Sequence, residues 1–124
     1  MTNIIAIAVG GAFGAVGRYA TSMWVYHLMG RDFPYGTLAV NLFGSFAMGI
    51  LSILLIERIN VAPELKSFLL VGFLGAYTTF STFSIETVNL INHGEMIKAG
   101  VNMLLSVFVC VVACWLGMIL GRQL

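Results

Sequence analysis

Four long apolar runs, separated by short polar stretches, set the pattern of hydrophobic and polar positions along the chain. The runs cover residues 4–28, 37–56, 65–91 and 97–120. Each has the roughly 20 mostly apolar residues that a helix needs to cross a bilayer. Arg18 interrupts the first run, and the third run has a polar middle. The pattern predicts an all-α integral membrane protein with one membrane domain, residues 1–124, and four transmembrane helices.

The composition supports this prediction. Of the 124 residues, 60% are hydrophobic and 9% are charged, against about 25% charged residues in an ordinary soluble domain. The mean hydropathy is +1.00. This composition disfavours a soluble enzyme. A nucleic-acid binder is also disfavoured, because the net charge of +1 offers no field to attract a polyanion. No ATP-binding motif is present, so we expect neither an enzyme nor a primary pump.

The basic residues are balanced between the two ends of the predicted helices. One end holds Arg58, Lys66 and Arg122, and the other holds Arg31 and Lys98, with Arg18 nearest to it. Because the Lys/Arg bias of short loops sets membrane orientation, this balance predicts insertion in both orientations. A small bias, such as the N-terminal amine, is the alternative. Oppositely inserted chains can form an antiparallel two-fold homodimer.

Small residues in the runs predict close helix packing. The glycines concerned are Gly10, Gly14 and Gly17 in the first run and Gly117 and Gly121 in the fourth. Small residues let helix backbones approach in a membrane. We interpret Cys110 and Cys114 as small buried side chains, because an i, i+4 pair on a helix is poorly directed for a disulfide. The two histidines, His27 and His93, are too far apart in sequence to suggest a metal site.

Two polar stripes lie inside the apolar runs. Thr37, Asn41 and Ser45 share a face of the second helix at a spacing of four. The fourth helix carries a second stripe of Asn102, Ser106, Cys110 and Cys114. Polar groups are costly in lipid unless they find partners. Each stripe is therefore explained either by hydrogen bonds between helices or by a polar pathway.

The third run is the most unusual, with five hydroxyl residues in the seven from Thr78 to Ser84. Gly75, just before them, predicts a break in this helix, and broken membrane helices occur where freed backbone meets protein, water or an ion. Phe80 and Phe83 share a face, and the edge of a phenyl ring is partly positive. Hydroxyl donors and ring edges suit a small anion held weakly enough to move on. A cation pathway would more often carry a ring of carboxylates, and this run offers only Glu86.

These residues resemble the signature of the Fluc/CrcB fluoride channel family. The matching motifs are Gly72-Phe73-Leu74-Gly75, Thr78-Thr79-Phe80-Ser81-Thr82-Phe83-Ser84-x-Glu86, Gly10-Gly11-Ala12-Phe13-Gly14-Ala15 with Arg18, and Gly36-Thr37-Leu38-x-Val40-Asn41-Leu42-x-Gly44. The resemblance covers nearly the whole chain. It departs at Asn102, where some members carry a tyrosine that faces the phenylalanines.

The resemblance implies a passive, fluoride-selective channel of the inner cell membrane that exports fluoride from the cytoplasm. It implies a dual-topology antiparallel homodimer in membrane lipid, with two pores and a structural sodium ion on the backbone carbonyls of Gly75 and Thr78. The residues expected along the pore are Asn41, Phe80, Phe83, Ser81, Thr82, Ser84 and Thr37, with Arg18 near a vestibule. We add Asn102 and Ser106 from the stripe of the fourth helix.

The alternative is a small proton-coupled exporter of the multidrug-resistance type, which also has about four helices and dual topology. Such exporters need an embedded carboxylate, which in that family lies in the first helix. Here the first helix carries only Arg18, and Glu86 is the sole acid inside a predicted span. A purely structural membrane subunit would leave the hydroxyl run unexplained.

Overall fold

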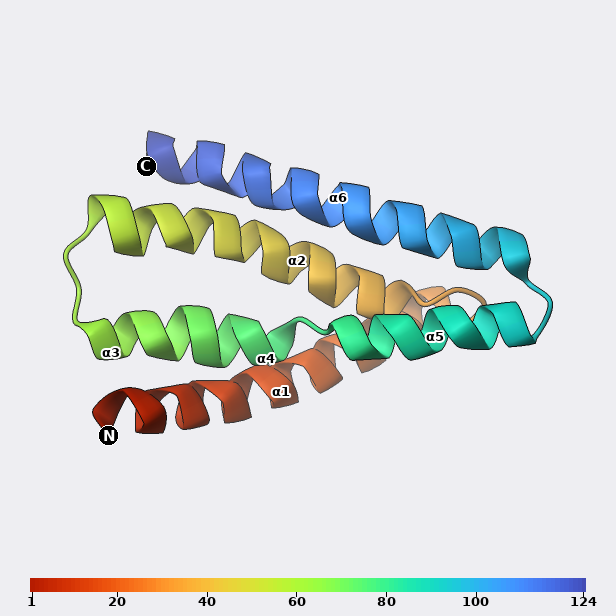
Figure 1. Cartoon of the computed structure of the whole chain (residues 1–124), viewed down its shortest axis with the longest axis horizontal. Coiled ribbons are helices and arrows are strands. Elements are labelled where there is room, and N and C mark those ends of the chain that lie inside the picture. The colour runs from red at the N-terminus through yellow and green to blue at the C-terminus, as the bar shows by residue number, and fades with distance from the viewer.

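The computed structural model describes all residues, 1–124, and every regular element in it is helical. Four helices are long and apolar enough to cross a membrane, as the sequence predicted (Figure 1). The first is α1, Thr2–Met29, and the second joins α2, Tyr35–Ser52, to a wider π-helical segment η1, Ile53–Arg58. The last is α6, Met96–Gln123. Each extends a few residues beyond the apolar run that predicted it.

The third span, Pro63–Asn92, is assembled from four segments. They are α3, Pro63–Lys66; the π-helical η2, Ser67–Leu74; α4, Gly75–Tyr77; and α5, Phe80–Asn92. Between α4 and α5, Thr78 (φ −85°, ψ 157°) and Thr79 (φ −151°, ψ 122°) are extended. We expected a departure from the helix at Gly75, but Gly75 is helical (φ −61°, ψ −37°) and the interruption lies three residues later.

The two ends of the bundle carry the charged residues. Figure 1 shows both termini and the η1–α3 connection at one end, and the α1–α2 and α5–α6 connections at the other. At the first end the Arg58 guanidinium donates to the carbonyl of Arg122. At the second end Lys98 Nζ donates to the carbonyl of Asp32 at 3.1 Å. The basic residues therefore fall into the two groups that the sequence suggested.

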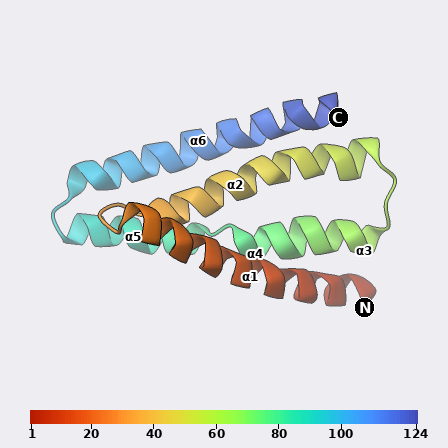
Figure 2. The same cartoon turned by 180° about the vertical axis from the view of Figure 1, so that it is seen from behind.

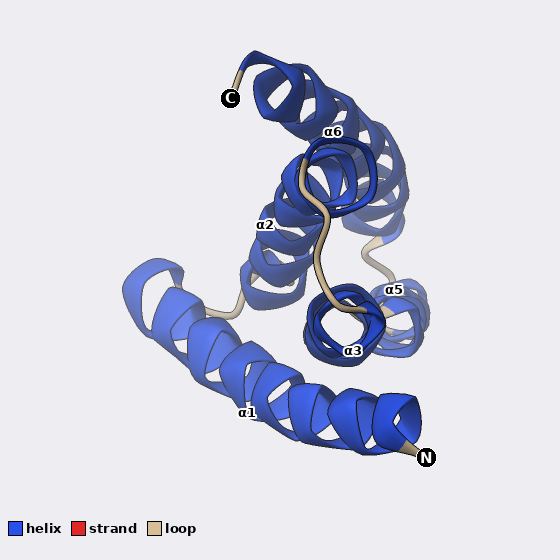
Figure 3. Ribbon diagram, turned by 90° about the vertical axis from the view of Figure 1, so that its left-hand side faces the viewer, coloured by secondary structure: helices blue, strands red, loops and turns tan.

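Glycines bring the helix backbones together at two contacts, which are the most extensive in the chain. Where α1 crosses η2 (Figures 2 and 3), a Cβ on Gly10 or Gly14 would collide with the carbonyl of Phe68 or Phe73. Where α2 lies along α6, a Cβ on Gly117 would collide with the Phe46 carbonyl. The packing role expected for these glycines is thus confirmed. Gly17 is looser, since its Cβ would make only ordinary contacts at 3.6 Å or more.

Candidate functional site

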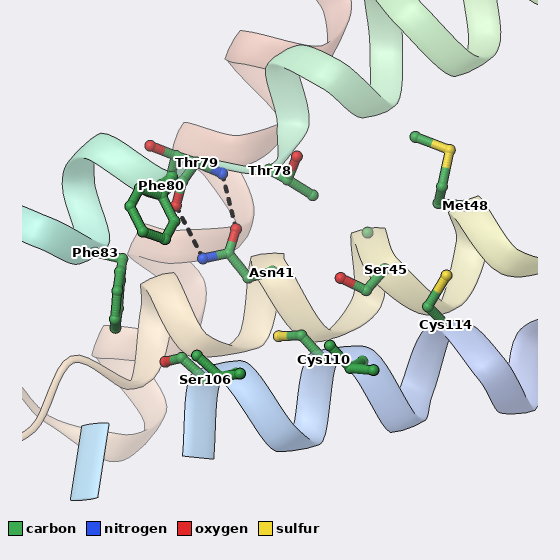
Figure 4. A pocket seen from close by; sticks show the side chains of 13 residues that line it. Asn41, Ser45, Met48, Thr78, Thr79, Phe80, Phe83, Ser106, Cys110 and Cys114 are labelled. Atoms are coloured by element: carbon green, nitrogen blue, oxygen red, sulfur yellow. Dashed lines mark hydrogen bonds between the residues drawn. The ribbon is translucent and has the colours of Figure 1, made fainter. Parts of the chain in front are cut away.

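The amide of Asn41 holds the interruption between α4 and α5. Its Oδ1 accepts from the Thr79 N–H at 2.8 Å, and its Nδ2 donates to the Thr79 carbonyl at 3.0 Å (Figure 4). In a continuous helix that N–H would bond to the carbonyl of Gly75, four residues earlier. Asn41, on α2, therefore pairs both backbone groups of Thr79 at the point where the chain leaves the helix.

Thr79 also starts the next helix. Its Oγ1 accepts from the N–H of Thr82 at 3.2 Å, which is the bond of a helix N-cap. The same Oγ1 donates to Thr82 Oγ1 at 3.1 Å. On the other side of the interruption, Thr78 Oγ1 donates to the Leu74 carbonyl at 3.0 Å. Thr78 and Thr79, at the start of the hydroxyl run, thus use their side chains to bond nearby backbone groups of their own span.

A groove of about 400 Å³ lies between α2, the interruption, the start of α5 and α6, and we name it the central groove. It is lined by Asn41, Gly44, Ser45, Met48, Thr78, Thr79, Phe80, Phe83, Ser106, Val107, Cys110, Val111 and Cys114. The rings of Phe80 and Phe83 are tilted by 52° with centroids 5.3 Å apart. Phe83 is buried, whereas Phe80 is 76% exposed in the single chain. The structure therefore brings Asn41, both phenylalanines and Ser106 together, as expected.

A second cavity of about 240 Å³, the inner cavity, shares Thr79 with the central groove. It contains the expected residues Arg18, Thr37 and Thr82 together with Glu86. Arg18 Nε and Glu86 Oε1 are buried without a hydrogen-bond partner, and these two side chains form no ion pair. The inner cavity is thus lined by a cationic and an anionic side chain, each with one buried polar atom that has no hydrogen-bond partner.

Tyr26 separates the inner cavity from a third one. Its hydroxyl donates to Glu86 Oε2 at 2.9 Å. The third cavity, of about 200 Å³, shares Tyr26 and Glu86 with the inner cavity and includes Arg31 and His93 near the α5–α6 connection. We did not single out Tyr26 from the sequence. The signal was present, because Arg18, Ser22 and Tyr26 follow at a spacing of four and so share one face of α1.

A buried polar chain joins α5 to α6. Asn102 Nδ2 donates to Thr87 Oγ1 at 2.9 Å, and Ser106 Oγ donates to Asn102 Oδ1 at 3.3 Å. Thr87 Oγ1 in turn donates to the Phe83 carbonyl at 2.8 Å. Asn102 is 2% exposed and does not line the central groove. Thr87, the partner that fixes Asn102, was missed by the sequence analysis.

Four other residues, from the stripe of the fourth helix and the hydroxyl run, are not placed as expected. Cys110 and Cys114 are half-buried free thiols on the central groove, not fully buried residues. Ser84 donates to the carbonyl of Phe80 within its own helix at 2.9 Å. Ser81 is exposed, with its Oγ 3.4 Å from Thr79 Oγ1. In the single chain Ser81 and Ser84 line neither the central groove nor the inner cavity.

The backbone at the end of α4 is the part of the chain best suited to a hard cation. No cluster of three or more His, Cys, Asp or Glu side chains is present. The last carbonyls of a helix have no intrahelical donor, and Asn41 has taken the donor that Gly75 would otherwise meet. Hard monovalent and divalent cations prefer such oxygen ligands. The structure thus leaves the carbonyl of Gly75 without its helical donor, and the sodium site on the carbonyls of Gly75 and Thr78 stays a prediction.

Comparison with known proteins identifies the family. A family model described as "CrcB-like protein, Camphor Resistance (CrcB)" matches residues 5–118. The protein named fluoride-specific ion channel FluC of Magnetococcus marinus is 55% identical over 116 residues, covering 94% of both chains. Proteins of the same name from Coxiella burnetii and Methylococcus capsulatus are each 52% identical and cover 98% of this chain. This chain spans 99% of the Coxiella protein but only 54%, about half, of the Methylococcus protein. On this evidence, the chain is a member of the CrcB-like family.

Proposed function

We propose that this chain forms a passive channel that is selective for fluoride and exports it across the inner cell membrane. The observation that supports this most directly is the interruption at Thr78 and Thr79, held by Asn41 beside Phe80 and Phe83. Relatives that match 94% and 98% of the chain carry the name fluoride-specific ion channel.

The chemistry of the central groove suits a small anion. Asn41 Nδ2 carries two hydrogens and gives one of them to Thr79, so the second can face the groove. The partly positive edges of the Phe80 and Phe83 rings add further weak contacts. The Ser106 hydroxyl, by contrast, gives its one hydrogen to Asn102 Oδ1. None of these groups carries a full positive charge. An anion would be held loosely at each and could pass on, as conduction requires.

The inner cavity supplies the attraction that the central groove lacks. Arg18 lies there without an ion-pair partner, so its charge can attract anions. Glu86 in the same cavity opposes this attraction, although the Tyr26 hydroxyl donates to one of its carboxylate oxygens. Thr37 and Thr82 line the same cavity, and Thr79 connects it to the central groove. An anion entering near Arg18 would then meet hydroxyl groups before it reaches the phenylalanines.

A second copy of the chain completes the proposal. Phe80 is 76% exposed in the single chain, so a single chain does not enclose an ion beside this ring. The balanced basic residues favour two chains in opposite orientations, and a two-fold dimer would repeat each groove to give two pores. A sodium ion on the carbonyls of Gly75 and Thr78 would add fixed positive charge and hold the ends of α4 in place.

The test is fluoride efflux from liposomes that contain only this protein, followed with a fluoride electrode. Potassium fluoride inside and valinomycin in the membrane allow charge-balanced efflux, and chloride-loaded liposomes measure selectivity. We expect rapid loss of fluoride and none of chloride. Phe80→Ile should lower the flux about fivefold or more, since the ring-edge contact is worth about 1 kcal/mol or more.

The matched control is Phe108→Ile, because Phe108 lies on α6 outside the central groove and is 65% exposed. Its flux should equal that of the unaltered protein. Liposomes that retain their fluoride would contradict the proposed function. A Phe80→Ile channel as active as the unaltered one would contradict the role of the ring edge.

A further inference from the structure

Three sulfur-bearing side chains line the central groove. They are Cys110 and Cys114 on α6 and Met48 on α2, and Figure 4 shows Met48 and Cys114 toward one end of the groove and Cys110 nearer its middle. We propose that they form a binding site for a soft monovalent cation of the copper(I) and silver(I) class. Occupation of this site would block the groove, and that consequence alone rests on the proposed function.

The backbone geometry brings Met48 near the level of Cys114. Cys110 and Cys114 are one helical turn apart on the same face, with Cβ atoms about 5–6 Å from each other. A Cβ on Gly49 would collide with the carbonyl of Cys114, so α2 and α6 approach closely here. Met48 is the neighbour of Gly49 in the chain, and its flexible thioether lines the same groove as the two thiols.

The surroundings select a soft ion over a hard one. Both cysteines are free and half-buried, so their thiols can be reached without unfolding. The groove is otherwise lined by apolar, hydroxyl and amide groups, with no carboxylate and no histidine. Hard cations prefer oxygen ligands, whereas thiolate and thioether sulfur selects soft ions such as copper(I). Zinc also binds thiolates, but it takes four ligands, and the groove offers no histidine or carboxylate to complete such a set.

Binding changes the charge of the groove. Each thiol that ligates the cation loses its proton, so two S–H bonds break, two metal–sulfur bonds form, and two protons pass to the solvent. A monovalent cation with two thiolates has a net charge of −1, and the Met48 thioether adds none. The site thus becomes a bulky anion at the edge of the groove, where it would repel another anion.

The experiment uses silver nitrate in chloride-free buffer with the purified, reduced protein. Calorimetry in detergent should show one silver ion bound per chain, and the heat measured in buffers of different ionisation enthalpy should give two protons released. In liposomes the same silver should lower fluoride efflux, expressed relative to the silver-free flux of each variant. Dithiothreitol, which removes silver from thiolates, should restore the flux.

Three variants decide the assignment. Replacing both thiols by hydroxyls, Cys110→Ser with Cys114→Ser, should abolish stoichiometric binding, proton release and inhibition together. Cys110→Ser alone should weaken binding at least about tenfold, because one thiolate is lost. Met48→Leu keeps the size of the side chain and both thiols, and it should weaken binding by a smaller factor while two protons are still released.

The outcomes separate this site from the proposed function. Silver that binds with release of two protons to a protein that conducts no fluoride would support the site and overturn the channel. A conducting protein that neither binds silver nor is inhibited by it would overturn the site. Binding that survives in the double serine variant would also overturn it, since silver would then be held by other methionines.

Discussion

The two long segments of the third span, η2 and α5, are held to the rest of the chain in different ways. η2 packs on α1 by shape, because Gly10 and Gly14 admit the carbonyls of Phe68 and Phe73 where a Cβ would collide. α5 is held by side-chain hydrogen bonds to three other helices. These bonds join Tyr26 to Glu86, Asn41 to Thr79 and Asn102 to Thr87.

The two kinds of contact leave different groups for an ion. The η2 half of the third span packs through its backbone, so it presents few polar side chains that an ion could use. The α5 half uses amides and hydroxyls for its contacts, and it borders all three cavities. Hydrogen bonds between membrane helices are individually modest, about 0.6 kcal/mol on average. The half of the span that faces the candidate pathway is therefore attached by the weaker kind of contact.

The largest loss of stability should come from disturbing the close backbone contact between α1 and η2. Gly14→Leu would drive a side chain into the Phe73 carbonyl, and backbone cannot move aside as a side chain can. Overpacking alone costs about 1–3 kcal/mol, so we expect this variant not to fold. The measurement is the yield of monodisperse protein by size-exclusion chromatography in detergent.

Gly100→Ala is the control, because a Cβ there would meet nothing within 4 Å. It should fold normally and could gain up to about 1 kcal/mol from its higher helix propensity. If Gly14→Leu were monodisperse in normal yield, the contact between α1 and η2 would not depend on close backbone approach.

An intermediate effect should come from Asn41→Asp. The new carboxylate can still accept from the Thr79 N–H, but it cannot donate to the Thr79 carbonyl and leaves that acceptor unpaired. The loss should be about 1–3 kcal/mol of stability. Fluoride flux should fall at least about tenfold, because a negative group then faces an anion pathway. Unfolding in detergent and the liposome assay measure the two effects.

Asn60→Asp makes the same chemical change in the exposed η1–α3 connection. It should alter neither stability nor flux noticeably. An Asn41→Asp protein that conducts like the unaltered one would show that Asn41 only holds the backbone and contributes nothing to the pathway.

The smallest effect should come from the bond between Asn102 and Thr87. A double-mutant cycle with Asn102→Leu and Thr87→Val should give a coupling energy of about 0.6–2 kcal/mol. Ser106→Ala, which removes only the 3.3 Å bond to Asn102, should cost less than Asn102→Leu. The midpoint of unfolding in mixed detergent measures each step, and a coupling near zero would mean that α5 is held to α6 by packing alone.

Features that depend on local sequence could be predicted. The four long helices follow from runs of apolar residues, and the pairing of Phe80 with Phe83 follows from the helical period. The position of the interruption could not be predicted, because it depends on Asn41, 38 residues before Thr79. Gly75 drew attention only because glycine permits a break. The break lies where a distant amide replaces the helical partner.

The prediction that the four residues of the stripe on α6 share one face was wrong for a geometric reason. Steps of four residues overshoot a 3.6-residue turn by about 40°, so a stripe of four such residues rotates by about 120° from end to end. Asn102 at one end therefore meets Thr87 on α5, while Cys110 and Cys114 face the central groove. The π-helical turns of η1 and η2 also escaped prediction, since hydropathy does not distinguish the two helix types.

The way Asn41 binds Thr79 carries a consequence for natural variation. The amide contacts only the N–H and carbonyl of Thr79, groups that almost every amino acid possesses. Position 41 should therefore accept few replacements, whereas position 79 is restrained by its task at the start of α5 and by its place between the central groove and the inner cavity. Serine and asparagine perform the first task as well as threonine, but aspartate would put a carboxylate into the proposed anion pathway. Homologous sequences should accordingly keep asparagine at position 41 and vary among threonine, serine and asparagine at position 79.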